Sequence, residues 1–391
     1  MKLIQRTNSC LGGVIVFFST MLLPPHTLGN EQIQVSANLF NLSMYSQESS
    51  IDDHFTNSAA LILGTDIQLD TQSNDLGVLK AQYIFNGLNN DAQLNTSTNW
   101  FGGVGSYIGG AISPNDIASS QLSLLTWDKK WDEDKIYTAI GRTNLRRYFL
   151  YNNCQNLMIC TDPIKIAMGS PPFTYGYWGG YLKYNLSDQL YFHTGVFEVN
   201  INDYLEKKKG LDFSFNDQLG YTQVYGVGYK DKQNKAEVFY FYNNSEYTNA
   251  FTKEKYRNTD GFNFRFNYDF KKNNIPEFYG AVSYITEKNQ PYKNYWELGF
   301  NYKLNAPGNH VGMKVGQTEL NNDFFQLTQQ LNGNQNRKTS FLSFDGAVKY
   351  KQLTLRPFVQ YIWNPDNYYR SNQGSFDSNI IVGLFTQLKI H

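Results

Sequence analysis

The sequence predicts an all-β fold, a transmembrane antiparallel β-barrel of about sixteen strands. Three observations predict it. The segments rich in β-formers are long, the connections between them alternate between short and long, and apolar and polar side chains alternate along several of them. The composition agrees, because aromatic residues make up 16% of the chain and charged residues only 17%, against the ~25% of charged residues usual in soluble domains.

The N-terminal segment, residues 1–29, has the parts of a secretory signal peptide. Lys2 and Arg6 supply positive charge, residues 11–23 are apolar, and small residues stand at the −3 and −1 positions. A transmembrane anchor is the alternative, but this apolar stretch is too short for one, and no later run of ~18 apolar residues could form a membrane helix. We expect cleavage after residue 29, which leaves residues 30–391 as one outer-membrane barrel domain.

Sixteen segments are rich in β-formers or alternate in polarity, and turn residues bound each of them. Most are 10 to 13 residues long. A tilted strand that crosses a membrane needs ~9–11 residues, whereas strands of soluble proteins average ~5–6. The predicted strands are 33–46, 58–70, 76–88, 119–130, 133–144, 176–185, 189–199, 220–230, 234–245, 261–271, 276–288, 293–303, 309–318, 340–350, 353–364 and 378–390.

The connections between these strands sort by length. Those that follow even-numbered strands have two to five residues, whereas seven of the eight that follow odd-numbered strands have eleven or more. Outer-membrane barrels have short periplasmic turns and long external loops, and an even number of strands returns both termini to the periplasmic side. A soluble sandwich gives no reason for such sorting.

Alternation gives an independent test of the prediction. From Phe262 to Phe270 every even position is aromatic and every odd position is polar, so one face of the strand is apolar and the other hydrophilic. The alternative is a half-buried sheet of a soluble protein, which would not have such long strands. In a membrane the sheet must close, since an open edge would leave backbone groups unpaired, and sixteen strands enclose an aqueous lumen.

Three segments resemble a known family. They are Leu122–Phe149, with a Trp-containing hairpin and a Gly-Arg pair, Pro171–Asn200, with a Gly-led hairpin, and Leu355–Pro365, with a Pro-x-x-Gln-Tyr element. Together they are similar to the OprB-type carbohydrate-selective porins of Gram-negative bacteria. The resemblance implies a sixteen-stranded outer-membrane channel for sugars. Barrels of this kind usually end in an aromatic residue that the assembly machinery reads, and this chain ends in His391.

The polar faces of the predicted strands would line the lumen. They carry charges of both signs among amides, and such a wall suits a sugar, whose hydroxyl groups both donate and accept hydrogen bonds. An anion pore should instead show a ring of Arg or Lys. The pore-lining residues predicted by parity are Asp66, Gln68, Lys80, Gln82, Arg265, Asp269, Glu297, Lys314, Arg356 and Gln360.

Three arginines complete the predicted lining. Arg142 belongs to the Gly-Arg pair and is included from the resemblance alone, because alternation groups it with the apolar Ile140. Arg146 and Arg147 open a long external loop. Contact with lipopolysaccharide is the alternative role for all three.

Two long loops, 89–118 and 145–175, are the candidates to fold inward and narrow the lumen. The second carries Cys154 and Cys160, and two nearby cysteines in an exported chain most often form a local disulfide. Such a bridge would stiffen the loop. Two thiolates with no histidine nearby make only half of a zinc site, so we expect no metal.

The sequence gives little support for catalysis or for a nucleic-acid partner. The glycines of residues 102–105 are not followed by Gly-Lys-Ser/Thr, and no histidine has the Ser partner that a barrel lipase would need. The formal net charge is zero, whereas a nucleic-acid partner would require a basic patch. We therefore expect neither enzymatic activity nor a cofactor.

These observations predict a channel for the passive, selective diffusion of mono- and disaccharides across the outer membrane of a Gram-negative bacterium. The expected partners are small sugars, outer-membrane lipid and lipopolysaccharide, and the barrel-assembly machinery. The alternatives are a general diffusion porin and a barrel adhesin or receptor that acts through its external loops. The sequence does not identify the sugar, the oligomeric state or the loop that narrows the channel.

Overall fold

The computed structural model describes residues 33–48, 54–70, 75–86, 120–150, 162–170, 175–200, 210–211, 219–232, 234–248, 254–270, 275–286, 290–305, 307–332, 336–365 and 377–390. The predicted signal peptide, the 89–118 loop and both cysteines of the predicted disulfide lie outside these residues.

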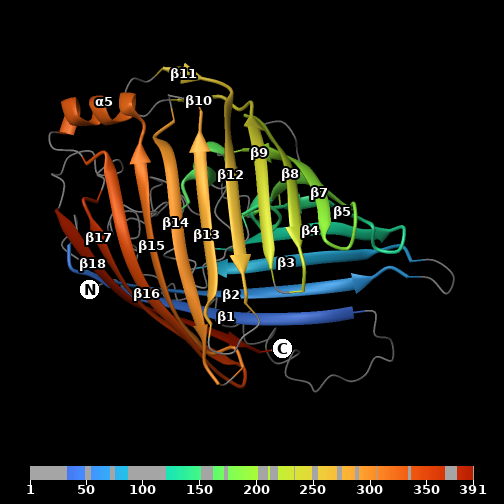
Figure 1. Ribbon diagram of the computed structural model, residues 1–391. Helices are drawn as coiled ribbons and strands as arrows, with labels where there is room; N and C mark the ends of the chain where they lie inside the picture. Colours follow the sequence, from blue (N-terminus) through green and yellow to red (C-terminus); the bar gives the residue numbers. More distant parts are fainter. Residues whose placement is uncertain are drawn as a thin grey trace, which may run out of the picture.

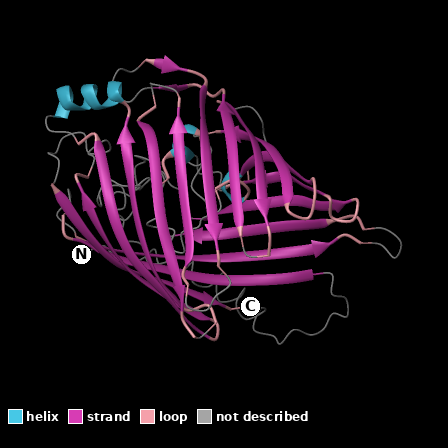
Figure 2. Cartoon of the chain, in the orientation of Figure 1, coloured by secondary structure: helices cyan, strands magenta, loops and turns pink. Residues whose placement is uncertain are grey.

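Sixteen strands form one closed antiparallel barrel (Figure 1, Figure 2). Consecutive barrel strands are neighbours, and β1 closes the ring against β18. The strands are β1 (Ile33–Ser46), β2 (Phe55–Gln68), β3 (Val78–Asn86), β4 (Ser120–Trp131), β5 (Ile136–Thr143), β6 (Tyr177–Asn185), β7 (Leu190–Val199), β8 (Gly220–Lys230), β9 (Lys235–Asn243), β12 (Thr259–Tyr268), β13 (Glu277–Ile285), β14 (Tyr292–Lys303), β15 (His310–Leu320), β16 (Lys338–Tyr350), β17 (Leu353–Trp363) and β18 (Ser378–Lys389).

The prediction of a closed antiparallel barrel of about sixteen strands is confirmed, and each predicted segment overlaps one barrel strand. Some boundaries differ by up to three residues, and β5 begins at Ile136 because the turn before it is longer than predicted. In that turn Asp132, Glu133 and Asp134 all have positive φ. Asp tolerates this backbone region better than most residues.

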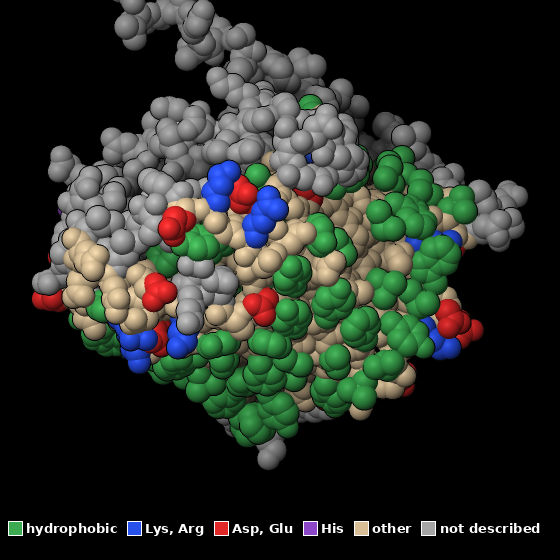
Figure 3. All heavy atoms as spheres, turned by 90° about the horizontal axis from the view of Figure 1, so that it is seen from above, with side chains coloured by type: hydrophobic (Ala, Val, Ile, Leu, Met, Phe, Trp, Pro, Cys, Tyr) green, Lys and Arg blue, Asp and Glu red, His purple; other side chains and the backbone are tan. Residues whose placement is uncertain are grey.

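The side chains of each strand alternate between the two faces of the barrel wall. On β12, Phe262 and Phe264 are 48% and 45% exposed on the outer face, while Asn263 and Arg265 are 0% and 5% exposed on the inner face. The predicted alternation of this strand is confirmed. Figure 3 shows hydrophobic side chains spread over much of the face in view, with charged side chains in a few separate groups. Such a wall suits contact with lipid acyl chains.

Two external connections contain structure that the sequence patterns did not predict. The connection after β9 forms the hairpin β10 (Tyr247–Thr248) and β11 (Lys255–Tyr256), and the connection after β15 contains α5 (Asn322–Asn332). Both lie at the same end of the barrel (Figure 1). Among the described residues, no helix has the length and apolar character needed to cross a membrane.

The connection between β5 and β6 folds back onto the inner wall. It contains a 3-10 turn, η1 (Leu145–Arg147), and a short helix, α3 (Ile164–Ala167), which contacts β12 and β13. Six apolar side chains of its described residues are almost fully buried, so burial of apolar area stabilises the inward position. The cluster comprises Leu145, Phe149, Leu150, Ile164, Ala167 and Met168 of the connection with Ala139, Tyr181, Phe197, Val224, Phe239, Phe241, Ile285, Tyr292 and Leu320 of the wall.

Candidate functional site

The inner wall of the barrel is the candidate functional site, and strand register places the parity-predicted residues along it. In the β2–β3 ladder Asp66 lies opposite Lys80, and in the β9–β12 ladder Arg265 lies opposite Glu237. The inward-facing strand residues of the predicted set are Asp66, Gln68, Lys80, Gln82, Arg265, Glu297, Lys314, Arg356 and Gln360. The remaining one, Asp269, follows the end of β12 and pairs with Lys303.

Arg142 occupies a different position from these residues. It shares the outward register of Ile140 and lies opposite Trp178 of β6, itself in the outward register. Unlike Ile140, which is 55% exposed, Arg142 is only 3% exposed. The preceding residue, Gly141, has a φ of 140°, a region that favours glycine. The register therefore does not group Arg142 with the inward-facing residues.

Arg146 and Arg147 have separate roles in the folded-back connection. Arg146 donates from Nε to Ser170 Oγ at 2.9 Å, and this bond joins the two described ends of the connection. Arg147 reaches the opposite way and donates to the Oε1 of Gln82 on β3. Asn144 stabilises the backbone of η1, which carries both arginines, because its side chain accepts a hydrogen bond from the Arg146 backbone N–H and caps this turn. The structure thus brings two predicted residues, Gln82 and Arg147, into contact.

Asp162 attaches the other end of the connection to the barrel wall. Its carboxylate accepts from Ser283 Oγ at 2.8 Å, from Asn263 Nδ2 at 3.0 Å and from the Ile164 backbone N–H at 3.0 Å. Burial raises the pKa of Asp162, and the nearby Arg265 guanidinium partly opposes that shift. Sequence patterns could not find this residue, since it lies in a loop with no periodicity.

Lys165 is a second buried charge in the same segment and is 7% exposed. Burial, together with the nearby charges of Arg146 and Lys314, lowers the pKa of Lys165 to about 7, and Asp162 partly opposes this shift. The ammonium group is therefore close to half-protonated near neutral pH.

This shift predicts a pH dependence of stability. Because the pKa in the folded protein lies below the ordinary 10.5, the unfolded chain binds more protons between pH ~7 and ~10.5, and the free energy of unfolding rises with pH across that window. We expect Lys165→Met to flatten this rise. Urea unfolding followed by tryptophan fluorescence at several pH values measures it. Parallel pH profiles for the two proteins would contradict the prediction.

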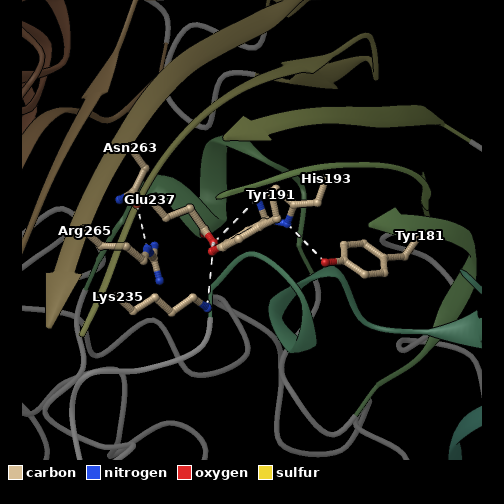
Figure 4. Close-up of polar contacts among 7 residues, drawn as sticks. All are labelled: Tyr181, Tyr191, His193, Lys235, Glu237, Asn263 and Arg265. Carbon is tan, nitrogen blue, oxygen red and sulfur yellow. Dashed lines mark hydrogen bonds and ion pairs between the residues drawn. The ribbon is translucent and has the colours of Figure 1, made fainter. Parts of the chain in front are cut away.

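A second polar cluster lies on the inner faces of β6 to β12 (Figure 4). The Tyr191 hydroxyl donates to Glu237 Oε2 at 2.5 Å, and Lys235 Nζ lies 3.7 Å from the same oxygen. His193 Nε2 is 3.6 Å from it, and His193 Nδ1 is 3.1 Å from the Tyr181 hydroxyl. The Glu237 carboxylate thus contacts side chains of β7 and β9, and His193 extends the cluster to Tyr181 of β6.

Two glycines on β8 make room for this cluster. A Cβ on Gly228 would lie 2.1 Å from the Tyr191 ring, and one on Gly226 would lie 2.2 Å from His193 Nε2. Both rings therefore lie directly across β8. Tyr191 and Glu237 were not predicted from the sequence, because inward aromatic residues interrupt the polar alternation of their strands. The glycines opposite them are a signal only once strand pairing is known.

Elsewhere on the wall, charges of opposite sign are held in pairs. Lys80 Nζ lies 3.0 Å from Asp128, which also accepts from the Tyr137 hydroxyl at 2.6 Å. Lys314 Nζ lies 3.2 Å from Glu297. Each pair links neighbouring strands across the lumen face, so the positions of these charges are fixed.

A closed sixteen-stranded barrel with a polar inner wall and a connection folded onto it defines a channel of the porin class. Residues 87–389 match the model of the OprB family, described as carbohydrate-selective porins. The chain belongs to this family, and its location is the outer membrane of a Gram-negative bacterium. The resemblance found in the sequence is confirmed. Among curated proteins, none matches the sequence.

Solved structures show the same fold. The high-pH structure of Pseudomonas putida OprB aligns with a TM-score of 0.76 at 16% identity and covers 97% of each chain. Salmonella typhi OmpF, solved in complex with daunomycin, aligns with a TM-score of 0.58 at 13% identity, over 91% of this chain and 97% of that one. The Acinetobacter baumannii channel DcaP aligns with a TM-score of 0.55 at 11% identity, over 92% and 97%.

Proposed function

We propose that this porin lets mono- and disaccharides diffuse passively down their gradients and selects them at its inner wall. The proposal rests chiefly on the fixed charges of both signs that face the lumen around a folded-back connection. Held donors and acceptors can replace the water hydrogen bonds of a sugar without being reorganised. In this proposal the predicted inward-facing residues line the path, the chain has no catalytic activity, and lipopolysaccharide and the assembly machinery are its other partners.

The contact between Arg147 and Gln82 is the proposed selecting point. Arg147 is exposed, although neighbouring described residues of the connection pack on the wall. Its side chain reaches Gln82 on β3, two strands away from β5 in the barrel. The neighbouring Lys80 and Asp128 form an ion pair with each other. A sugar that passes here would exchange the Arg147–Gln82 hydrogen bond for bonds to its own hydroxyl groups.

Single-channel conductance in a planar bilayer, titrated with glucose and a disaccharide, tests the proposal. We expect conductance that falls saturably with sugar, and about tenfold weaker block in Arg147→Gln, because a hydrogen bond from a charged donor is lost. Arg257→Gln in the exposed β10–β11 region is the matched control and should keep the wild-type block. Conductance indifferent to every sugar would leave a general diffusion porin. A folded barrel without conductance would favour the adhesin or receptor.

A further inference from the structure

A patch of positive charge lies on the inner wall at the end of the barrel where the connections are short. Lys183 of β6, Lys230 of β8 and Lys235 of β9 all have inward register. All three are partly exposed, and the Lys235 side chain is 33% exposed. They are therefore accessible to a solute in the lumen. We refer to Lys183, Lys230 and Lys235 as the lysine patch.

The strand pairing places like charges together within the lysine patch. Lys230 lies directly opposite Lys235 in the β8–β9 ladder, and like charges directly opposite each other destabilise a sheet. The three ammonium groups lie close enough to interact electrostatically. Lys183 Nζ is 4.1 Å and Lys235 Nζ 5.9 Å from the centre of the same Tyr191 ring. The pairing thus concentrates positive charge at a cost in stability.

The carboxylate beside the lysine patch does not neutralise it. Glu237 is 3.7 Å from Lys235 Nζ, but the same oxygen also accepts from Tyr191 and faces His193. Asp269, the other described inner-wall carboxylate close to Lys235, pairs with Lys303. Among the described residues, Glu237 against three lysines therefore leaves an excess of positive charge. Arg265, also on the inner wall and opposite Glu237 in the ladder, adds to it.

The excess is local to this side of the lumen. On the inner faces of β13 to β16 the acidic Glu277, Glu297 and Asp345 lie among the basic Lys303 and Lys314, and Lys314 pairs with Glu297. The described charges there are mixed, whereas positive charge predominates at the lysine patch. A solute with an anionic group would be drawn to the lysine patch.

We propose that the lysine patch is a binding station for carbohydrates that carry an anionic group, a carboxylate or a phosphate. The inference rests on the proposed sugar channel and adds a substrate class to it. The anionic group would accept hydrogen bonds from the ammonium groups, which are then charge-assisted. A neutral sugar lacks this interaction and would pass the lysine patch with lower affinity.

Isothermal titration calorimetry of the refolded barrel in detergent, with gluconate, glucose 6-phosphate, glucose and inorganic phosphate as probes, tests the proposal. We expect gluconate and glucose 6-phosphate to bind about tenfold more tightly than glucose. The Lys183→Gln/Lys235→Gln double variant should abolish that preference, and rising salt should weaken it. Lys351→Gln, in the exposed turn between β16 and β17, is the matched control and should keep it.

The probes separate the sources of binding. Tight binding of glucose 6-phosphate alone would restrict the station to phosphates, and tight binding of gluconate alone to carboxylates. Equal affinity of glucose and gluconate, or a preference that survives the double variant, overturns the proposal even if glucose blocks the conductance. Inorganic phosphate that binds as tightly as glucose 6-phosphate would also overturn it, because the sugar part would then contribute nothing to binding. Failure of the proposed channel itself appears separately, as an absence of conductance.

Discussion

Asp162→Ala is expected to raise single-channel conductance several-fold and to weaken block by sugar. Asp162 attaches the folded-back connection to β12 and β13 through Asn263 and Ser283. Its removal leaves the Ser283 hydroxyl without this acceptor, whereas Asn263 Nδ2 still donates to Ser283 Oγ at 2.7 Å. A buried donor left without an acceptor costs ~1–3 kcal/mol. The connection would then leave the wall more often and widen the lumen. Conductance histograms in a planar bilayer measure the effect.

The apolar cluster could also hold the connection on the wall without the hydrogen bonds of Asp162. If Phe149, Ile164 and Met168 alone hold the connection, Asp162→Ala will conduct like the wild type, which contradicts the prediction. Asp323→Ala is the control. It removes a carboxylate from α5, in the connection after β15, and should leave the conductance unchanged.

The pH dependence of the same contact has a defined sign. Because burial raises the pKa of Asp162, its carboxylate takes up a proton at a higher pH than an ordinary Asp. The protonated acid loses its attraction to Arg265, so wild-type conductance should rise as the pH falls. Asp162→Asn carries no titrating group and should show a smaller change over the same range.

Sequence periodicity predicted the wall of this protein well and its interior contacts poorly. The wall follows local rules: on β12 the strand length, the aromatic alternation and the turns specify which face is outward. The folded-back connection does not, because Asp162 finds its partners on strands about a hundred and more residues away. Inward aromatic residues such as Phe239 also break the polar parity, since they face the connection and not water.

At Arg142 the resemblance and the alternation gave different predictions. The Gly-Arg pair pointed to the lumen, whereas alternation grouped the residue with Ile140, and the observed register agrees with the alternation. Local periodicity is a direct consequence of strand geometry. A short motif carries no such geometric constraint. Arg142 is nevertheless 3% exposed, unlike Ile140 at 55%, so its place in the pore lining stays a prediction.

Glu297→Gln is expected to produce the largest loss of stability among the inner-wall substitutions. Lys314 is 1% exposed and its Nζ lies 3.2 Å from Glu297. The same carboxylate accepts from the Tyr295 hydroxyl at 2.6 Å. Removing one partner of a buried ion pair leaves an uncompensated charge and typically costs ~3–5 kcal/mol. Urea unfolding of the refolded barrel, followed by tryptophan fluorescence, measures this cost.

The double variant Glu297→Gln/Lys314→Met tests whether the loss of stability comes from the unpaired charge of Lys314. Replacing both members of a buried pair often restores much of the stability, so we expect the double variant to be more stable than Glu297→Gln alone. The Met side chain can also keep the contact of Lys314 with Phe341, whose ring centre lies 5.1 Å from Nζ. Glu246→Gln, which breaks an exposed pair in the β10–β11 region, should leave the stability unchanged. If the double variant is no more stable than Glu297→Gln, the loss comes from the hydrogen bond with Tyr295, and the charge of Lys314 is stabilised by other groups.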